Sequence, residues 1–127
     1  MEIYPMIFLT VDESYAFDYL SILEIKCKKD KNSRTKKQLY NQCFISIKKQ
    51  LSDTLFKSII SSKEYKECCK ANFDTFIAVD SAKTDKVKAS FVDRCNYKRF
   101  TAKQKLQKKF FGNSITEIKI GYEHYKE

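Results

Sequence analysis

The sequence predicts a mainly α-helical protein: an antiparallel helical hairpin or a small bundle of about four helices, with a short N-terminal strand and a C-terminal strand paired to it. Apolar residues recur every three or four positions through the middle of the chain, as on one face of a helix. The 127 residues include only two glycines and one proline, too few turn residues for an all-β sandwich. This length fits one domain spanning residues 1–127.

The N-terminal strand is expected over residues 3–11, which are rich in β-branched and aromatic side chains. A first helix follows Asp12 and Glu13, because acidic residues are favoured in the first turn of a helix. The basic stretch that leads to Ser33 predicts a turn. The apolar stripe of this first helix is formed by Ala16, Tyr19, Leu20, Leu23 and Cys27.

Two further helices are predicted in the middle of the chain. One runs from Thr35 to Ser61, and the next begins at the cap formed by Ser61 and Ser62. The stripe of the helix over 35–61 is Leu39, Cys43, Ile47, Leu51 and Leu55. The stripe of the following helix is Tyr65, Cys69, Phe73, Phe76, Ile77 and Val79.

A fourth helix is predicted over residues 86–111, capped by Thr84 and Asp85 and ended by Gly112. Its seam alternates steps of three and four residues and contains two cations, so it differs from a plain hydrophobic zipper. The seam residues are Val92, Cys95, Arg99, Ala102, Leu106 and Lys109. Residues 115–120 alternate apolar and polar side chains, which predicts a half-buried strand that pairs with residues 3–9.

The formal net charge of +9 is concentrated in two segments. Residues 26–37 hold seven basic residues and one acidic residue, and residues 86–109 hold nine basic residues and one acidic residue. Basic patches attract polyanions such as nucleic acids, although lysine-rich faces are also common as plain solvated surface. The nucleic-acid-binding candidates are Lys98, Lys105, Lys108 and Lys109.

Several kinds of chemistry are excluded or disfavoured by residue types. The scarcity of glycine excludes phosphate-binding loops, and the only histidine, His124, lies in the charged terminal segment. No Cys-x-x-Cys pair is present, so we expect no metal site and no cofactor. We interpret the cysteines at 27, 43, 68, 69 and 95 as reduced core thiols. No apolar run is long enough to span a membrane, and we expect a cytoplasmic protein that is not an enzyme.

Polar residues interrupt the apolar stripes of the last two helices. Three of them, Asn96, Arg99 and Lys103, form one row on the helix over 86–111. If the two helices pack antiparallel, this row faces a second row formed by Asn72, Asp80 and Lys83. Such rows predict a polar network inside the fold. The alternatives are a small anionic-ligand site around Arg99 and Lys103, or an intermolecular contact.

Three stretches of the chain resemble a family of short bacterial and phage proteins known only as a domain of unknown function. They are residues 18–26, which match the pattern Asp-x-Leu-[Ser/Thr]-Ile-Leu-Glu-Ile-Lys, residues 72–83, and residues 91–119, which contain the helical pattern Asn-x-x-Arg-x-x-x-Lys. Tyr19 and Lys83 depart from the family, which has Lys and Arg at these positions. The resemblance implies a compact, mainly helical cytosolic protein and carries no activity.

These features predict a non-enzymatic helical interaction protein, a homodimer, that acts through its helix faces and its basic surface. One alternative is a sequence-nonspecific nucleic-acid-binding protein that uses the basic segments 26–37 and 86–109. The other alternative is the anionic-ligand site around Arg99 and Lys103.

Overall fold

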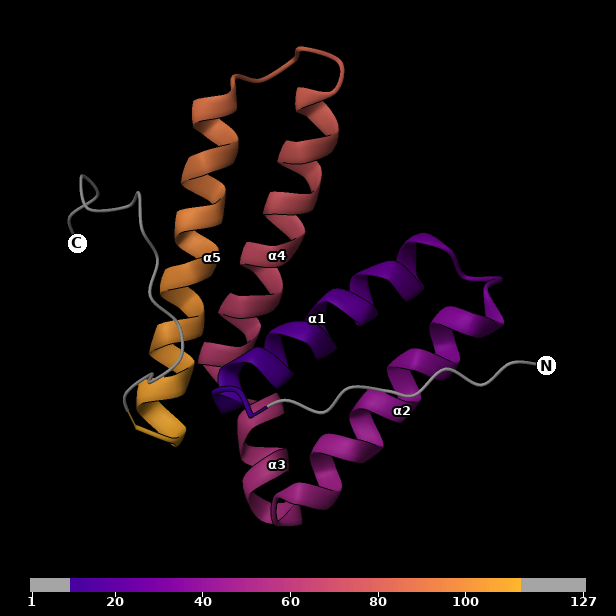
Figure 1. The fold of residues 1–127 in the computed structure, drawn as a ribbon, viewed down its shortest axis with the longest axis vertical. Helices are drawn as coiled ribbons and strands as arrows, with labels where there is room; N and C mark the ends of the chain where they lie inside the picture. The colour runs from indigo at the N-terminus through magenta and orange to yellow at the C-terminus, as the bar shows by residue number, and fades with distance from the viewer. Residues whose placement is uncertain (1–9, 113–127) are drawn as a thin grey trace.

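The computed structural model describes residues 10–112, and in this range the chain is helical, as predicted (Figure 1). The predicted strand over 115–120 and residues 3–9 of its predicted partner lie outside the described residues. The described part of the chain forms five helices: α1 Glu13–Lys29, α2 Arg34–Gln50, α3 Asp53–Ile60, α4 Lys63–Ala82 and α5 Ala89–Phe110. No helix among them is both long and apolar enough to cross a bilayer.

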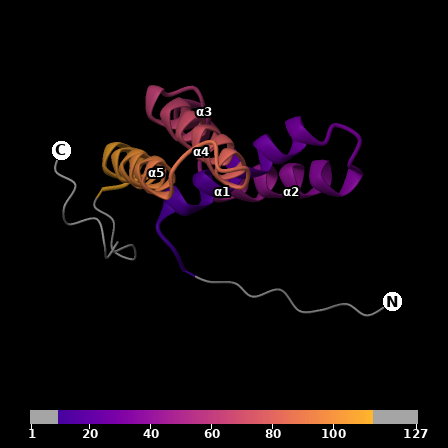
Figure 2. The same ribbon diagram turned by 90° about the horizontal axis from the view of Figure 1, so that it is seen from above.

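The helices form two antiparallel hairpins, α1–α2 and α4–α5, joined through the short helix α3 (Figures 1 and 2). Helix α1 packs against both α4 and α5 at the end of their hairpin that lies near α3. The α1–α2 hairpin then diverges to one side, and the far half of the α4–α5 hairpin projects beyond it (Figure 1). The molecule therefore has a joined base and two separated arms.

The core lies at this base, where α1, α3, α4 and α5 meet. Phe17, Phe56 and Leu106 are almost completely buried there. The ring centroid of Phe17 lies 6.1 Å from that of Phe56, 6.0 Å from that of Tyr65 and 6.4 Å from that of Phe111. Full burial of a large apolar side chain stabilises a fold by roughly 1.5–3 kcal/mol, so this aromatic cluster helps to join the hairpins.

The prediction of one continuous helix over 35–61 is wrong, because the chain breaks at Leu51 and Ser52. Leu51 is extended, with φ −120° and ψ 164°. The Ser52 hydroxyl accepts a hydrogen bond from the backbone N–H of Leu55 at 3.1 Å and so caps α3. This break lets α3 turn away from α2 and bury Phe56 and Ile59 in the core.

The predictions for the other helix ends are confirmed in part. The hydroxyl of Ser62 accepts from the N–H of Tyr65 at 3.0 Å, which confirms Ser62 as the cap of α4. Gly112 follows α5 with a φ of +101°, which confirms that it ends this helix. The predicted cap at Thr84 and Asp85 is wrong, because α5 begins only at Ala89. Asp85 has a φ of 58° and shapes the turn between α4 and α5 instead.

The buried faces of α1 and α4 differ from the predicted stripes. Tyr19 is 50% exposed, and α1 buries Phe17, Asp18 and Ser21 beside its leucines. Helix α4 buries Cys68, Asn72 and Thr75, whereas the predicted stripe residues Phe73, Phe76, Ile77 and Val79 are 40–44% exposed. The face of α4 that meets α1 is held by polar contacts, and much of its apolar face is left at the surface.

Candidate functional site

Four polar side chains from three helices form one buried network where α1, α4 and α5 meet. The Arg99 guanidinium of α5 donates from Nη2 to Asp18 Oδ2 of α1 at 2.7 Å and from Nε to the side-chain oxygen of Asn72 of α4. Asn72 Nδ2 donates to Asp18 Oδ1 at 2.9 Å and to Ser21 Oγ at 2.5 Å. Ser21 in turn donates to the backbone oxygen of Asp18 at 2.8 Å.

This network satisfies the charge and the polar atoms that the fold buries. Asp18, Ser21 and Asn72 are all buried, and the Arg99 side chain is only partly exposed. Both carboxylate oxygens of Asp18 accept a hydrogen bond, and the Asn72 amide both donates and accepts. Burying such groups is costly unless each is paired, so the network ties the three helices together in one register.

A second polar contact lies farther along α5. Lys103 is 5% exposed, and its Nζ lies 4.6 Å from the ring centroid of Tyr15 on α1, a cation–π contact. One turn later, Gln107 Oε1 accepts a hydrogen bond from the backbone N–H of Ser14 at 2.9 Å. Gln107 Nε2 donates to Glu13 Oε2 at 3.4 Å. The end of α5 therefore caps the beginning of α1.

Four of the six predicted polar residues reach one pocket of about 280 Å³ beside the network. Asn72 and Arg99 lie in its wall together with Asp80 and Lys83, both of which are exposed. The predicted facing of the two rows is therefore correct for Asn72 and Arg99. Asp80 lines the pocket, but the carboxylate that Arg99 binds is Asp18.

The other two predicted residues do not line this pocket. Lys103 lies under Tyr15, and Asn96 is half-buried on α5. An anionic-ligand site made jointly by Arg99 and Lys103 therefore lacks one of its two cations at the pocket.

Sequence reasoning missed Asp18, Ser21 and Gln107. Carboxylates on a helix are usually solvated, and the stripe of apolar residues gave no reason to bury Asp18. Their spacing could have indicated their burial. Asp18 and Ser21 are three residues apart and share the face of α1 that also carries Phe17. Gln107 continues the row of Arg99 and Lys103 by one more turn.

A long groove runs along the α4–α5 hairpin on the side of α4 opposite Asn72. Its volume is about 890 Å³. Ile77 of α4 and Phe91 of α5 line it and are 40% and 49% exposed. Charged side chains flank this apolar strip, with Glu67, Lys70 and Asp74 on α4 and Arg94, Lys98 and Lys105 on α5.

The two basic segments lie on opposite sides of the molecule. Residues 26–37 form the turn of the α1–α2 hairpin, and residues 86–109 form most of α5, with α4 between them (Figures 1 and 2). Lys98, Lys105, Lys108 and Lys109 are exposed on α5. Lys109 is paired with Glu64 of α4 at 3.0 Å, so the four candidates do not form one uninterrupted cationic surface with segment 26–37.

No protein-family model, curated protein or solved structure matches this chain. The resemblance to a family of short bacterial and phage proteins stays a prediction.

Proposed function

We propose that this chain is a non-enzymatic helical interaction protein that forms a homodimer through the groove of its α4–α5 hairpin. The observation that carries this proposal is the apolar strip in that groove, where Ile77 and Phe91 remain 40% and 49% exposed. Contiguous exposed apolar surface bordered by polar residues is typical of protein interaction sites. A second copy is the occupant that the charges of the groove favour.

The charges on the two walls of the groove complement each other. Glu67 and Asp74 lie on α4, and Lys98 and Lys105 lie on α5. The two helices run antiparallel, so residues at equal distances in sequence from the turn over 83–88 lie side by side. Glu67 is therefore level with Lys105, and Asp74 is level with Lys98. A two-fold axis along the groove places α4 of each copy over α5 of its partner. Each acidic side chain then faces a lysine of the other copy.

The ion pairs of the groove within one chain support the same arrangement. Neither Lys98 nor Lys105 forms an ion pair within residues 10–112, while Glu67 and Asp74 make only exposed pairs with Lys63 and Lys70 on their own helix. Exposed pairs of this kind are weak, at about 0.3–0.5 kcal/mol. The carboxylates are therefore available to a partner at little cost.

The hairpin is large enough for a stable contact. Helix α5 has 22 residues, which corresponds to a length of about 33 Å and, for two helices about 10 Å wide, a face of roughly 650 Å². Stable protein interfaces cover about 600–1,000 Å² on each partner, so this face lies near the lower end of that range. The two faces together would form a four-helix bundle of the ordinary antiparallel kind.

The Arg99 pocket supports an anionic ligand less well. Two donor groups of the guanidinium are already engaged with Asp18 and Asn72, and Asp80 adds a further carboxylate to the wall. The network is better interpreted as a structural contact that holds the α4–α5 hairpin against α1.

Sedimentation velocity at 5 to 100 µM (on the order of typical dimer affinities) tests this proposal. We expect a dimer for the unmodified chain and a monomer for Ile77→Asp, because an aspartate would bury a charge in the apolar strip. Ile45→Asp is the matched control, since Ile45 is 51% exposed on α2, outside the groove. A monomer at every concentration for the unmodified chain, or equal effects of both variants, would contradict the proposal.

A further inference from the structure

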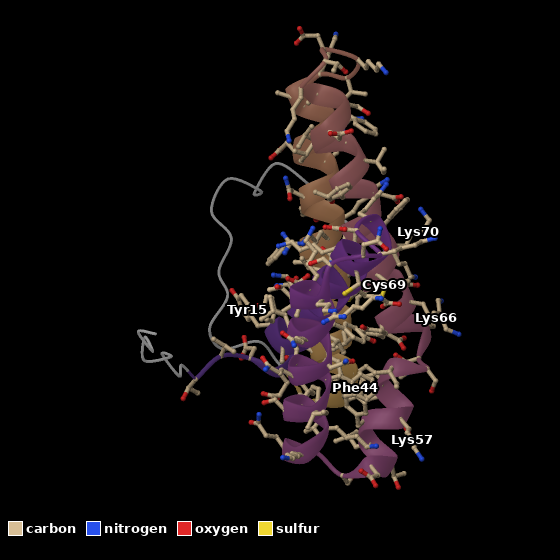
Figure 3. The ribbon with its side chains drawn as sticks, turned by 90° about the vertical axis from the view of Figure 1, so that its right-hand side faces the viewer. Tyr15, Phe44, Lys57, Lys66, Cys69 and Lys70 are labelled. Atoms are coloured by element: carbon tan, nitrogen blue, oxygen red, sulfur yellow. The ribbon has the colours of Figure 1, made fainter. Side chains whose placement is uncertain are left out.

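A third cavity, of about 700 Å³, lies in the angle between α1 and α4. It differs from both the Arg99 pocket and the α4–α5 groove in combining an apolar floor with a basic rim. Its floor contains Ile25 of α1, Ile60 of α3, and Tyr65, Cys69 and Phe73 of α4. In Figure 3 the labelled Cys69 lies between α1 and the outer edge of α4, which carries Lys66 and Lys70. The volume is in the usual range for small-molecule sites, about 300–1,000 Å³.

The floor is desolvated most strongly at Tyr65, whereas Ile25, Ile60 and Cys69 are half-buried and Phe73 is 44% exposed. Tyr65 is buried, and burial raises its pKa far above the ordinary range for tyrosine. Burial also raises the pKa of the Cys69 thiol, which keeps that thiol neutral. A neutral floor of this kind binds the apolar part of a ligand and has no charge of its own to bind an ionic group.

The cavity is lined by four lysines from two helices and by one carboxylate, that of Glu24 on α1. Lys28 and Lys29 come from the last turn of α1, and Lys66 and Lys70 lie one turn apart on α4. Lys28 is paired with Glu24, and Lys70 is paired with Asp74. Lys66 forms no ion pair with any residue in the described range 10–112, so within that range its charge is uncompensated.

Lys29 connects the rim to the apolar floor. Its Nζ lies 5.6 Å from the ring centroid of Phe73 and 5.4 Å from that of Phe76. Cation–π attraction holds this ammonium group over the two rings. The Lys29 side chain stays exposed, so it remains accessible to an anionic group at the rim.

From this combination we infer that the cleft between α1 and α4 binds a single-chain amphipathic anion, an apolar hydrocarbon tail that ends in a carboxylate. The tail occupies the floor over Tyr65 and Phe73. The carboxylate lies at the rim between Lys29 of α1 and Lys66 of α4. The cleft shares Lys70 and Phe73 of α4 with the dimer groove. Lys29 and Lys66 line only the cleft, so variants at these two lysines test this inference separately from the proposed dimer.

Isothermal titration of the full chain with decanoate tests this inference, using octanoate, decanol and acetate as comparison ligands. We expect saturable binding of decanoate, and octanoate should bind roughly tenfold more weakly, because each buried methylene contributes about 0.8 kcal/mol. Decanol lacks the charge and should bind at least tenfold more weakly than decanoate. Acetate lacks the tail and should not bind measurably.

The double variant Lys29→Glu, Lys66→Glu identifies the site, and we expect it to weaken decanoate binding at least tenfold. Lys49→Glu, Lys57→Glu is the matched control, since both lysines are exposed outside the cleft (Lys57 is labelled in Figure 3). Equal binding of decanol, no dependence on tail length, or equal effects of the two double variants would overturn the inference. The inference would also be overturned if decanoate failed to bind and single-stranded RNA bound instead, with the RNA binding abolished by Lys29→Glu, Lys66→Glu.

Discussion

Arg99 contacts two other helices through one guanidinium group. Its planar set of donors reaches a carboxylate on α1 and an amide on α4 at the same time, which a lysine cannot do with the same geometry. The stability of the junction of these three helices should therefore depend on this residue.

We expect Arg99→Ala to lower the free energy of unfolding by about 3 kcal/mol or more, because the Asp18 carboxylate would remain buried without its cation. Urea unfolding followed by circular dichroism measures this decrease. Lys108→Ala is the control, since its side chain is exposed on α5 outside the groove, and it should change stability by less than about 0.5 kcal/mol. An equally small change for Arg99→Ala would show that the network does not hold the helices.

Burial at the core also makes stability sensitive to alkaline pH. Burial raises the pKa of the Cys68 thiol from an ordinary value of 9.0 to about 12. The unfolded chain loses this proton first, so the contribution of the neutral thiol to stability is complete below pH 9 and is lost as the pH rises from 9 to 12. The thiols of Cys43 and Cys69 are shifted in the same direction.

We expect Cys68→Ala to reduce the fall in the free energy of unfolding between about pH 8.5 and 10.5 relative to the unmodified chain. Urea midpoints measured across this range check the slope. Cys27→Ala is the comparison variant, since Cys27 is only half-buried on α1. An identical slope for the unmodified chain and Cys68→Ala would contradict the burial of this thiol.

The positions of the helices could be predicted from the sequence more accurately than the faces that the helices bury. Ser62, Gly112 and the apolar periodicity locate α4 and the end of α5, because local hydrogen bonds and backbone conformation set these features. The break at Ser52 could not be predicted in this way, since the apolar stripe continues through it on both sides. The buried face of α4 could not be predicted either, because Asn72 and Thr75 are buried by other helices, which no pattern within one helix reveals.

The contact between the end of α5 and the start of α1 gives a test at this level. Gln107→Met keeps the size of the side chain and removes the acceptor for the N–H of Ser14. We expect a decrease in stability of about 1–3 kcal/mol, the cost of a buried donor left without a partner. Thermal unfolding measures it, and Gln104→Met, a half-buried neighbour on α5, is the control. Equal stability of the two variants would count against the capping role of Gln107.

Two diverging hairpins on one base give the whole molecule three adjoining surfaces: the α4–α5 groove, the cleft between α1 and α4, and the basic turn over residues 26–37. The cleft shares Phe73 with the groove and Lys29 with the basic turn. The separation of this turn from α5 weakens the hypothesis of one continuous nucleic-acid-binding surface (Figure 2). Of the candidate site, Asn72 and Arg99 could be predicted from polar residues in apolar seams. Asp18 could not, because its partner lies 81 positions away along the chain.

Nucleic-acid binding remains a prediction that charge reversal can test. If α5 carries this function, the affinity for mixed-sequence DNA should fall with salt, with a slope of log K against log salt of roughly −0.9 for each phosphate that the protein neutralises. Reversing Lys105 and Lys108 to Glu should weaken binding and make this slope shallower. Fluorescence polarisation at about 50, 150 and 300 mM salt measures both effects. Absence of binding at the lowest salt would leave these lysines as solvated surface.

Self-association through the α4–α5 groove is tested most directly by mixing two charge-reversed chains. Glu67→Lys, Asp74→Lys makes both walls of the groove basic, and Lys98→Glu, Lys105→Glu makes both walls acidic. Each variant alone should sediment as a monomer, because like charges then face each other across the two-fold axis. An equimolar mixture should form a heterodimer, since every reversed pair becomes complementary again. Monomers in the mixture, or dimers of either variant alone, would contradict the proposed interface.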